Sequence, residues 1–418
     1  MVPNGWESAT LGDLVNKSAF GPRFTSELYS EDGAIGTIRT TDLYNEGEIN
    51  YATIPYANLD ISEYEEHALK EGDLLITRSG TCGIPCIFTE QEKPIIAGAF
   101  LIRFQLNNKI DSKFLHEALK SAPIQSNIKR MSAGGVQKNL TGTSLRKLLI
   151  PVPPLTEQRK IATILGTWDK AISTTERLID NSKQQKKALM QQLLTGKKRL
   201  LDDSGKPFKG EWEDFYLHDA AKIIVSPVDK KTVEGEIPVE LCNYTDVYYN
   251  TRITNSIDFM KATAKKSEID KYTLQVNDVI ITKDSETPGD IAIPALVSEN
   301  LGGTVCGYHL AIIRPNSRLA EGAYLNYLFS MPKTRYYFFT LATGATRFGL
   351  SIGGINKAHF TLPPLDEQQK IASVLTNADQ EIELLEQQLA DLKQEKKALM
   401  QQLLTGKRRV KLDEKEVT

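Results

Sequence analysis

The amino-acid sequence repeats itself at half its own length. The segment 186–197, KKALMQQLLTGK, recurs unchanged at 396–407 in a chain of 418 residues. The match extends over residues 153–199 and 363–409, where 27 of 47 aligned positions are identical. A repeat with this period indicates two copies of one structural unit. We therefore expect two similar halves related by a pseudo-two-fold axis.

Both repeated segments have the pattern of a long helix. Each follows a Pro-Pro-Leu stretch, and Thr156 and Asp366 stand in favourable N-cap positions. Gly196 and Gly406 come where a helix C-cap belongs. Apolar residues recur at steps of three and four, which predicts a coiled coil. The helices could form a stalk or an oligomerisation zipper, or they could pair antiparallel inside one chain.

The identity of the repeat exceeds what packing between the helices requires. A seam needs only its apolar positions, yet Lys186, Lys187, Gln191 and Gln192 are repeated as well. Two identical outward faces would suit two copies of one partner. We therefore predict two equivalent docking surfaces.

The regions outside the repeat, residues 1–150 and 211–362, have diverged strongly from each other. Both alternate short β-type runs with turn residues and then carry a helical stretch, which predicts a compact mixed α/β domain in each half. The expected strands include 74–77, 95–104, 279–282 and 310–314, and the expected helical stretches are 113–131 and 320–339. Shared helices and divergent domains suggest one common partner and two different targets.

Bulk composition narrows the class of protein. The formal net charge is −2, so any binding of nucleic acid must depend on local positive surfaces, such as residues 151–210 with 12 basic and 6 acidic side chains. The four cysteines fit neither a metal site nor a disulfide framework. No signal peptide is recognisable, and no apolar run approaches the roughly 20 residues of a membrane helix. We expect a soluble, cytoplasmic protein.

Polar loops at equivalent places in the two halves are candidates for contact with DNA. Glycines allow close approach to phosphates, and Gln, Asn, Arg and Lys side chains read base edges. Any one loop could be an ordinary solvated turn, but recurrence with different polar residues favours recognition. The predicted contact residues are Arg39, Thr41, Arg78, Ser79, Thr81, Gly134, Gly135, Gln137, Lys138 and Asn139 in the first half, and Asn243, Tyr244, Thr245, Lys283, Ser285, Gly344, Thr346 and Arg347 in the second.

Catalytic motifs are missing from the sequence. Thr195-Gly196-Lys197 lacks the first glycine of a phosphate-binding loop, and the five histidines have no partner at metal-ligand spacing. Adenine methyltransferases use an Asn/Asp-Pro-Pro-aromatic turn, which neither Pro-Pro pair matches. We predict no catalytic residue and no metal site.

The helix starts PPL-x-EQ-x-KIA at 153–162 and 363–372, with the LLTGK helix ends, closely resemble the DNA-specificity subunits of type I restriction–modification systems. The resemblance covers essentially the whole chain. It implies an α+β fold, with target recognition domains at 1–152 and 206–362 separated by two long helices that form an antiparallel coiled coil. These spacer segments are residues 153–205 and 363–418, the second including a charged tail.

The resemblance also implies the partners. Two methyltransferase (modification) subunits would bring S-adenosylmethionine and methylate adenines in double-stranded DNA, and restriction subunits would bring ATP-driven translocation and cleavage. This chain itself would bind no cofactor, neither S-adenosylmethionine nor ATP nor Mg. The alternatives are a self-contained methyltransferase or nuclease, a structural coiled-coil adaptor, or a silent or inverting specificity cassette.

Overall fold

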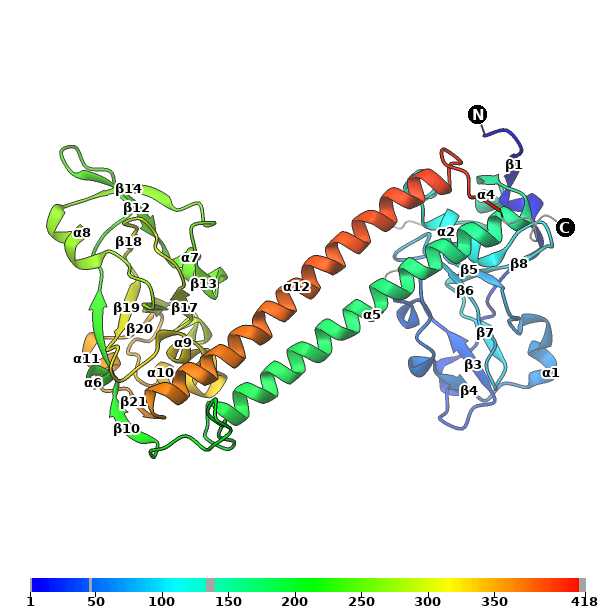
Figure 1. Ribbon diagram of the computed structural model, residues 1–418. Coiled ribbons are helices and arrows are strands. Elements are labelled where there is room, and N and C mark those ends of the chain that lie inside the picture. Colours follow the sequence, from blue (N-terminus) through cyan, green and yellow to red (C-terminus); the bar gives the residue numbers. More distant parts are fainter. Residues whose placement is uncertain (1, 45–46, 133–139, 413–418) are drawn as a thin grey trace. The chain divides into compact units, whose positions relative to one another are not determined.

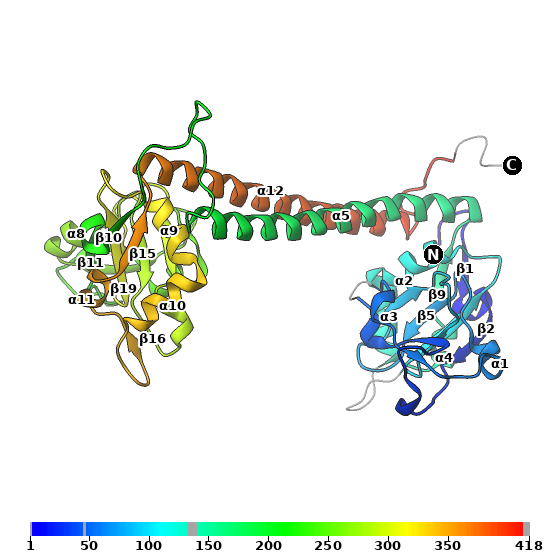
Figure 2. The same cartoon turned by 90° about the horizontal axis from the view of Figure 1, so that it is seen from below.

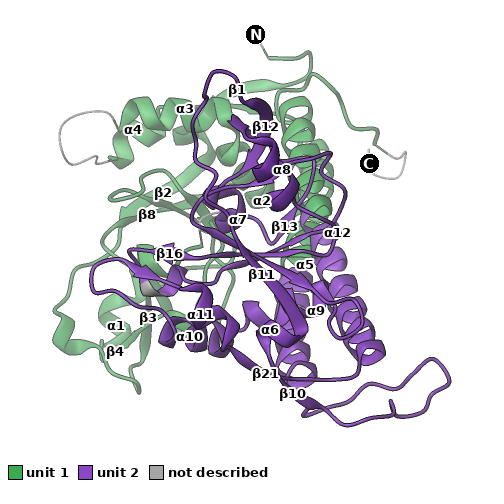
Figure 3. Cartoon of the chain, turned by 90° about the vertical axis from the view of Figure 1, so that its left-hand side faces the viewer, with its two compact units in different colours: residues 1–176, 387–418 green, residues 177–386 purple. Residues whose placement is uncertain are grey.

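The computed structural model describes residues 2–44, 47–132 and 140–412 (Figure 1). They form two compact units, unit 1 with Met1–Glu176 and Gln387–Thr418 and unit 2 with Arg177–Glu386 (Figure 3). Two helices of 39 residues, α5 (Leu155–Leu193) and α12 (Leu365–Leu403), contribute one half to each unit. Unit 1 therefore joins the two ends of the chain, and the domain boundaries predicted at 152, 205 and 362 stay a prediction.

The two long helices pair antiparallel within each unit, which is one of the arrangements that the repeat left open and the one that the family resemblance implied. In unit 1, Lys393 of α12 contacts Glu176 of α5 at 2.7 Å. In unit 2 the helices exchange roles, and Lys183 of α5 contacts Glu386 of α12 at 2.7 Å. Because Glu176 corresponds to Glu386 and Lys183 to Lys393 in the repeat, the two ion pairs join equivalent sequence positions. The helices thus form an antiparallel coiled coil with internal pseudo-symmetry.

The described residues of unit 1 form three small sheets. Helix α2 (Ser112–Lys120) packs on the four-stranded sheet, which is antiparallel throughout. The sheets have the orders β1 (Glu7–Thr10)–β9 (Leu149–Val152), β2 (Val15–Phe20)–β8 (Leu101–Leu106)–β5 (Leu74–Thr77)–β6 (Pro85–Ile87) and β4 (Tyr56–Ala57)–β3 (Ile35–Ile38)–β7 (Ile95–Ala97). The helices are α1 (Ile61–Tyr64), α2 (Ser112–Lys120), α3 (Ala122–Met131) and α4 (Gly142–Arg146), with 3-10 turns η1 (Leu11–Leu14), η2 (Ser26–Leu28), η3 (Thr40–Asp42), η4 (Tyr51–Thr53) and η5 (Glu65–His67).

Unit 2 has the same arrangement of elements, but its central sheet has more strands. Helix α9 (Gly322–Ser330) lies against this five-stranded sheet (Figure 2). The sheets are β10 (Glu213–Tyr216)–β21 (His359–Leu362), β11 (Ala221–Val225)–β19 (Leu310–Pro315)–β15 (Val279–Thr282)–β17 (Pro294–Val297)–β13 (Arg252–Ile253), β14 (Met260–Ala264)–β12 (Ile237–Cys242)–β18 (Val305–Cys306) and β16 (Asp284–Ser285)–β20 (Phe348–Gly349). The helices are α6 (Leu217–Ala220), α7 (Tyr244–Tyr249), α8 (Lys266–Tyr272), α9 (Gly322–Ser330), α10 (Pro332–Thr340) and α11 (Ile352–Asn356), with the 3-10 turn η6 (Pro288–Asp290).

The central strands β5 and β15 were predicted correctly, and their side chains are fully buried. Each is tied to the neighbouring long strand by an arginine, which is buried in unit 1 and half-buried in unit 2. Arg103 Nε donates to Asp73 at 2.7 Å, and Arg314 Nε donates to Asp278 at 2.8 Å. A buried carboxylate requires such a partner. The same pair recurs at the same place, so the two domains share one fold although their sequences have drifted apart.

Three predicted elements are each divided in two. The helical stretches expected at 113–131 and 320–339 break at Ser121 and Met331, because Pro123 and Pro332 cannot continue the preceding helix and start a new one. The strand expected at 95–104 divides into β7 and β8 around Gly98. Its backbone passes so close to Ile38 that an added Cβ would lie 2.7 Å from the carbonyl oxygen of Ile38.

The long helices begin at Leu155 and Leu365, two residues earlier than the predicted N-caps imply. The preceding prolines accept the first helical hydrogen bonds, so Thr156 and Asp366 lie inside the first turn instead of at the N-cap. The helix ends predicted at the two glycines are confirmed. Gly196 and Gly406 follow the last helical turn with φ of +69° and +67°, a conformation that favours glycine.

The glutamine of the PPL-x-EQ motif fastens each domain to its helix. Gln158 Oε1 accepts from the backbone N–H of Asp111 at 2.7 Å, and its Nε2 donates to the carbonyl of Lys109 at 3.0 Å. Gln368 makes the equivalent contacts with the loop before α9. Both glutamines are buried. Their full hydrogen bonding explains why this position is the same in the two copies.

The glutamate of the motif binds the basic residue that follows the other helix. Arg409 donates to both carboxylate oxygens of Glu157 at 2.7 and 2.6 Å, and Arg199 donates to those of Glu367 at 3.1 and 2.7 Å. In unit 1, Trp6 Nε1 also donates to Glu157 at 3.1 Å. These contacts clamp the two helices together at the outer end of each pair.

Lys396 interrupts the apolar seam in the sequence, yet its side chain is only 8 % exposed. It contacts Glu117 of α2 at 2.9 Å and Asp169 of α5 at 2.5 Å. Burial by itself would raise the pKa of Glu117, but His116 and the lysine charges lower it to about 2. The buried lysine is therefore fully paired.

The equivalent Lys186 of unit 2 contacts Asp379 and lies over the ring of Tyr327 at 5.5 Å. Tyr327 thus occupies the place that Glu117 has in unit 1. In neither unit does this lysine stand on the outward face that the repeat suggested.

Candidate nucleic-acid interface

Three of the predicted polar loops of unit 2 come together at one cleft. The cleft has a volume of about 430 Å³. It receives Tyr244 and Thr245 from α7, Ser285 from β16, and Arg347 from the turn before β20. The remaining lining residues are Tyr248, Tyr249, Asp284, Glu286, Thr287, Asp290 and His309. Segments separated by about a hundred residues in sequence therefore form one polar surface.

Asp284 is the electrostatic centre of this cleft. His309 Nδ1, Arg347 Nη2 and Lys283 Nζ lie 2.5, 2.9 and 3.2 Å from its carboxylate oxygens. Burial by itself would raise the pKa of Asp284, but the hydrogen bonds from His309, Arg347 and Lys283 leave that pKa below its usual value. The carboxylate therefore stays ionised and holds Lys283, His309 and Arg347 around it.

Gly344 makes the sharp turn that presents Thr346 and Arg347. Its φ is +127°, and a Cβ at this position would lie 1.9 Å from the carbonyl oxygen of Arg347. Thr343 and Gly349 close the turn with two backbone hydrogen bonds of 2.9 Å. Glycine is therefore required by the turn itself, and Thr346 and Arg347 are exposed at its tip.

Three tyrosine side chains also line the cleft. The rings of Tyr244 and Tyr248 stack with centroids 5.7 Å apart, and Tyr249 packs edge-on against Tyr248. Tyr248 Oη donates to Asp290 at 3.3 Å. The side chain of Tyr249 is 78 % exposed. These tyrosine rings offer an apolar surface to bases, including the thymine methyl group.

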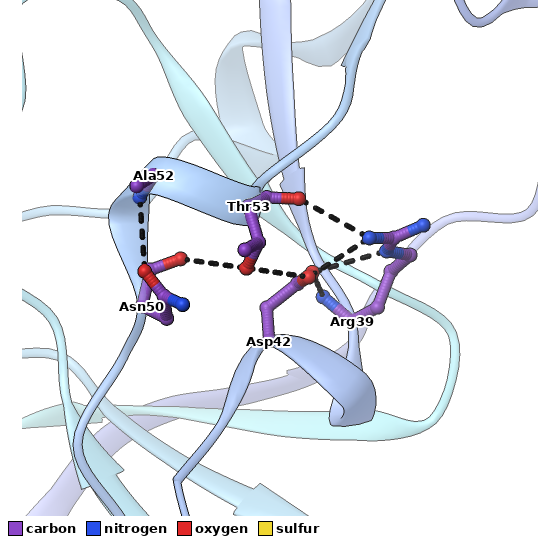
Figure 4. Close-up of polar contacts among 5 residues, drawn as sticks. All are labelled: Arg39, Asp42, Asn50, Ala52 and Thr53. Atoms are coloured by element: carbon purple, nitrogen blue, oxygen red, sulfur yellow. Dashed lines mark hydrogen bonds and ion pairs between the residues drawn. The ribbon is translucent and has the colours of Figure 1, made fainter. Parts of the chain in front are cut away.

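In unit 1 the predicted Arg39 is held by its own turn (Figure 4). Its Nε and Nη2 donate to the two carboxylate oxygens of Asp42 at 3.0 and 2.8 Å, and Nη2 also donates to the carbonyl of Thr53 at 3.2 Å. The hydrogen bond with Asp42 raises the pKa of Arg39. Asp42 is buried, and its backbone turn also carries Thr41.

The same turn occurs in unit 2 with another residue at its head. Asp246 accepts from the backbone N–H of Asn243 at 2.7 Å, as Asp42 accepts from that of Arg39 at 2.8 Å. Asn243 is 6 % exposed, and its amide donates to the carbonyl of Leu241. It shapes the turn, while Tyr244 and Thr245 reach the cleft.

Arg78 and Lys283 occupy equivalent positions after the central strands. The backbone N–H of Arg78 donates to Phe100, and that of Lys283 donates to His309, at 2.9 and 2.8 Å. The guanidinium of Arg78 lies 4.4 Å from the ring centre of Phe20. Phe20 and Phe100 are both exposed, so unit 1 presents an arginine among aromatic side chains.

The remaining predicted residues are placed as follows. Ser79 and Thr81 lie in the turn after β5, where the carbonyl of Thr81 accepts from the Thr77 hydroxyl at 2.6 Å. Gly134, Gly135, Gln137, Lys138 and Asn139 lie outside the described residues. None of the predicted DNA contacts is tested by the structure alone, and all of them stay predictions.

Sequence reasoning missed Asp284, His309, Tyr248 and Tyr249 as cleft residues. The segment around Asp284 was singled out, but a single sequence gives no sign that this carboxylate organises the others. His309 has a φ of +72°, unusual for a residue other than glycine. Only the assembled sheet reveals that it lies beside Asp284.

Among the described residues, no group of three or more His, Cys, Asp or Glu side chains is placed to hold a metal ion. No helix in the described part of the chain is long and apolar enough to cross a membrane. Of the four free cysteines, Cys86, Cys242 and Cys306 are buried, and burial raises the pKa of each thiol.

The protein has two equivalent mixed α/β domains on paired antiparallel helices. Each domain presents a different set of polar loops, as expected of a protein that recognises a target in two parts. The family described as type I restriction modification DNA specificity domain matches residues 3–182 and 209–394, and the chain belongs to it. It is a DNA-specificity subunit with two recognition domains, as the sequence predicted.

The similarity extends over most of each chain. The putative type I restriction enzyme MjaX specificity subunit of Methanocaldococcus jannaschii is 26 % identical, over 98 % of this chain and 95 % of the relative. The EcoKI specificity subunit of Escherichia coli is 23 % identical, over 88 % and 81 %.

Solved structures share the fold. The S subunit of a type I system from M. genitalium superimposes with a TM-score of 0.57 at 16 % identity, covering 99 % of both chains. The HsdS subunit from Thermoanaerobacter tengcongensis gives 0.52 at 17 % identity, covering 97 % of this chain and 98 % of that one.

Proposed function

We propose that this chain reads a bipartite, asymmetric sequence in double-stranded DNA and carries no catalytic site of its own. The observation that supports this is the recurrence of one fold with different polar residues at matching places. Arg39, Arg78 and Phe100 in unit 1 correspond to Asn243, Lys283 and His309 in unit 2. Because different side chains read different base edges, the two half-sites should differ in sequence.

The repeated helix ends are the proposed docking surfaces for two modification subunits. Each consists of exposed residues near the C-terminal end of a long helix. The first surface is Lys187, Gln191 and Gln192, and the second is Lys397, Gln401 and Gln402. Lys186 and Lys396 do not belong to these surfaces, because they bind carboxylates inside their own units. Their identity in both copies reflects packing, not partner binding.

In this proposal the partner subunits supply the chemistry. Modification subunits would bind S-adenosylmethionine, and restriction subunits would bind ATP and Mg. The complex would act in the cytoplasm, where its DNA substrate lies. Methylation by the purified chain alone would instead favour a self-contained methyltransferase. Specific DNA binding by the complex would argue against a purely structural adaptor.

The first prediction concerns the docking surfaces. Replacing Lys187, Gln191 and Gln192 together with alanine should leave the stability nearly unchanged, because solvated positions contribute little to folding. The variant should bind one modification subunit where the natural chain binds two, as measured by native mass spectrometry. A matched control replaces Lys170, Arg177 and Asp180, which are exposed on α5 but not repeated.

Binding of two modification subunits by the docking variant would contradict this prediction. Loss of both subunits, with the control unaffected, would indicate that the two surfaces do not act independently. Circular dichroism of both variants checks that the helices remain intact.

The second prediction concerns the isolated chain. Its formal net charge is −2, and phosphate neutralisation supplies much of the affinity for DNA. We expect micromolar or weaker binding by the chain alone at physiological salt, and tight, specific binding after assembly with modification subunits. Fluorescence anisotropy with target and scrambled duplexes measures both. Nanomolar, sequence-specific binding by the isolated chain would overturn this expectation.

A further inference from the structure

Arg347 is the principal exposed cation of the unit 2 cleft. It is the only lysine or arginine among the described residues that line the cleft. Its side chain is 56 % exposed, whereas that of Asp284 is 11 % exposed. Asp284 Oδ1 lies 2.9 Å from Nη2, and His309 ring nitrogens lie 3.2 and 3.4 Å from the same Nη2. The guanidinium is thus held on one side and open on the other.

The ion pair with Asp284 does not explain why an arginine stands here. Lys283 Nζ already lies 3.2 Å from a carboxylate oxygen of Asp284, so this carboxylate has a cationic partner without Arg347. An ion pair with so exposed a partner contributes little to stability. The contact therefore serves to orient the arginine more than to stabilise the domain.

The charges around Arg347 favour base edges over phosphates. Asp284, Glu286 and Asp290 line the same cleft. Carboxylates repel the DNA backbone, but they are compatible with amino groups in the major groove. A cleft that combines one oriented arginine with three carboxylates and three tyrosines is suited to reading bases.

We propose that Arg347 reads a guanine in the half-site bound by unit 2, and that Asp284 is the positioning residue for it. Arginine donates to guanine O6 and N7 together, the most common specific contact in the major groove. Asp284 Oδ1 accepts one hydrogen of Nη2. The other Nη2 hydrogen and the N–H beside it on the same edge of the guanidinium remain to donate together to the base. This inference rests on the proposed function, because it specifies one contact of the recognition that function requires.

The experiment uses the full chain assembled with modification subunits. A library of duplexes with a randomised second half-site is methylated, and the methylated molecules are sequenced. In Arg347→Ala, the preference for guanine at one position should fall roughly 10- to 100-fold, with preferences at the first half-site unchanged. Arg347→Lys should weaken the same preference while keeping overall affinity, because lysine keeps the charge but lacks the rigid, planar pair of donors.

Two further variants separate positioning from general damage. Asp284→Asn keeps the shape of the side chain but removes its charge, so it should relax the preference at the same single position. Arg318→Ala removes an exposed arginine of the same domain that does not line the cleft, and it should leave every preference unchanged.

Each outcome has a distinct meaning. Wild-type preference in Arg347→Ala overturns the inference and leaves the proposed function standing. Uniformly weaker methylation without a change in preference marks Arg347 as a phosphate contact and also overturns it. Absence of any sequence preference in the natural complex would contradict the proposed function itself.

Discussion

Inserting one heptad into each long helix, after Ile179 in α5 and after Leu389 in α12, will lengthen the gap between the two half-sites. A whole heptad preserves the apolar seam of a coiled coil. Seven helical residues add about 10 Å to each helix. Because DNA rises about 3.4 Å per base pair, the gap should grow by up to about three base pairs. Both half-sites should stay the same, since the polar loops lie outside the helices.

Methylome sequencing of a host that expresses the complex measures this directly. The two insertion points are equivalent in the repeat, and each lies between residues that form the helix–helix ion pairs. A control with the heptad in α5 alone should lose assembly, because its seam no longer matches that of α12. An unchanged gap in a variant that still methylates would show that the helices do not set the spacing.

Replacing Arg199 with alanine will destabilise unit 2 more than replacing Arg409 destabilises unit 1. Glu367 is 0 % exposed, and Arg199 is its only side-chain donor in the described part of the chain. Removing the arginine leaves a buried carboxylate unpaired, which costs about 3 kcal/mol. Glu157 would keep the Trp6 N–H, so Arg409→Ala should cost about 1–2 kcal/mol.

Hydrogen exchange followed by mass spectrometry reports each unit separately, through β10 and β21 for unit 2 and β1 and β9 for unit 1. Trp212 stands where Trp6 stands in unit 1, but its Nε1 has no partner among the described residues. The double variant Arg199→Ala/Glu367→Gln should recover much of the loss, because the buried charge is gone. Equal losses in the two single arginine variants would contradict the argument.

Much of the architecture was predictable because its signals are local or repeated. The identity between 153–199 and 363–409 predicted two units, and the apolar spacing predicted paired helices. The glycines at 196 and 406 marked the helix ends. The family was identified from the same motifs. The divided helices at Ser121 and Met331 were missed although Pro123 and Pro332 are visible in the sequence.

The candidate cleft could be predicted only in outline. Its loops were found because they recur in both halves, but their side chains gave no sign of their surroundings. Asn243 and Tyr244 are adjacent in sequence, yet the amide of Asn243 is buried against its own turn while Tyr244 lines the cleft. Which neighbour faces outward depends on the backbone path, which a single sequence does not give.

The sequence by itself determined that this protein consists of two copies of one unit, because the repeat and the apolar periodicity of its helices are local signals. Its membership of the family of DNA-specificity subunits was recognised from the motifs of the same repeat. Tertiary structure alone decided that Lys396 is buried and Lys186 half-buried, since their carboxylate partners come from other elements. It also decided that Asp284 gathers Lys283, His309 and Arg347 into one cluster. Contacts between residues far apart in the chain leave no local pattern, and such contacts make up the candidate site.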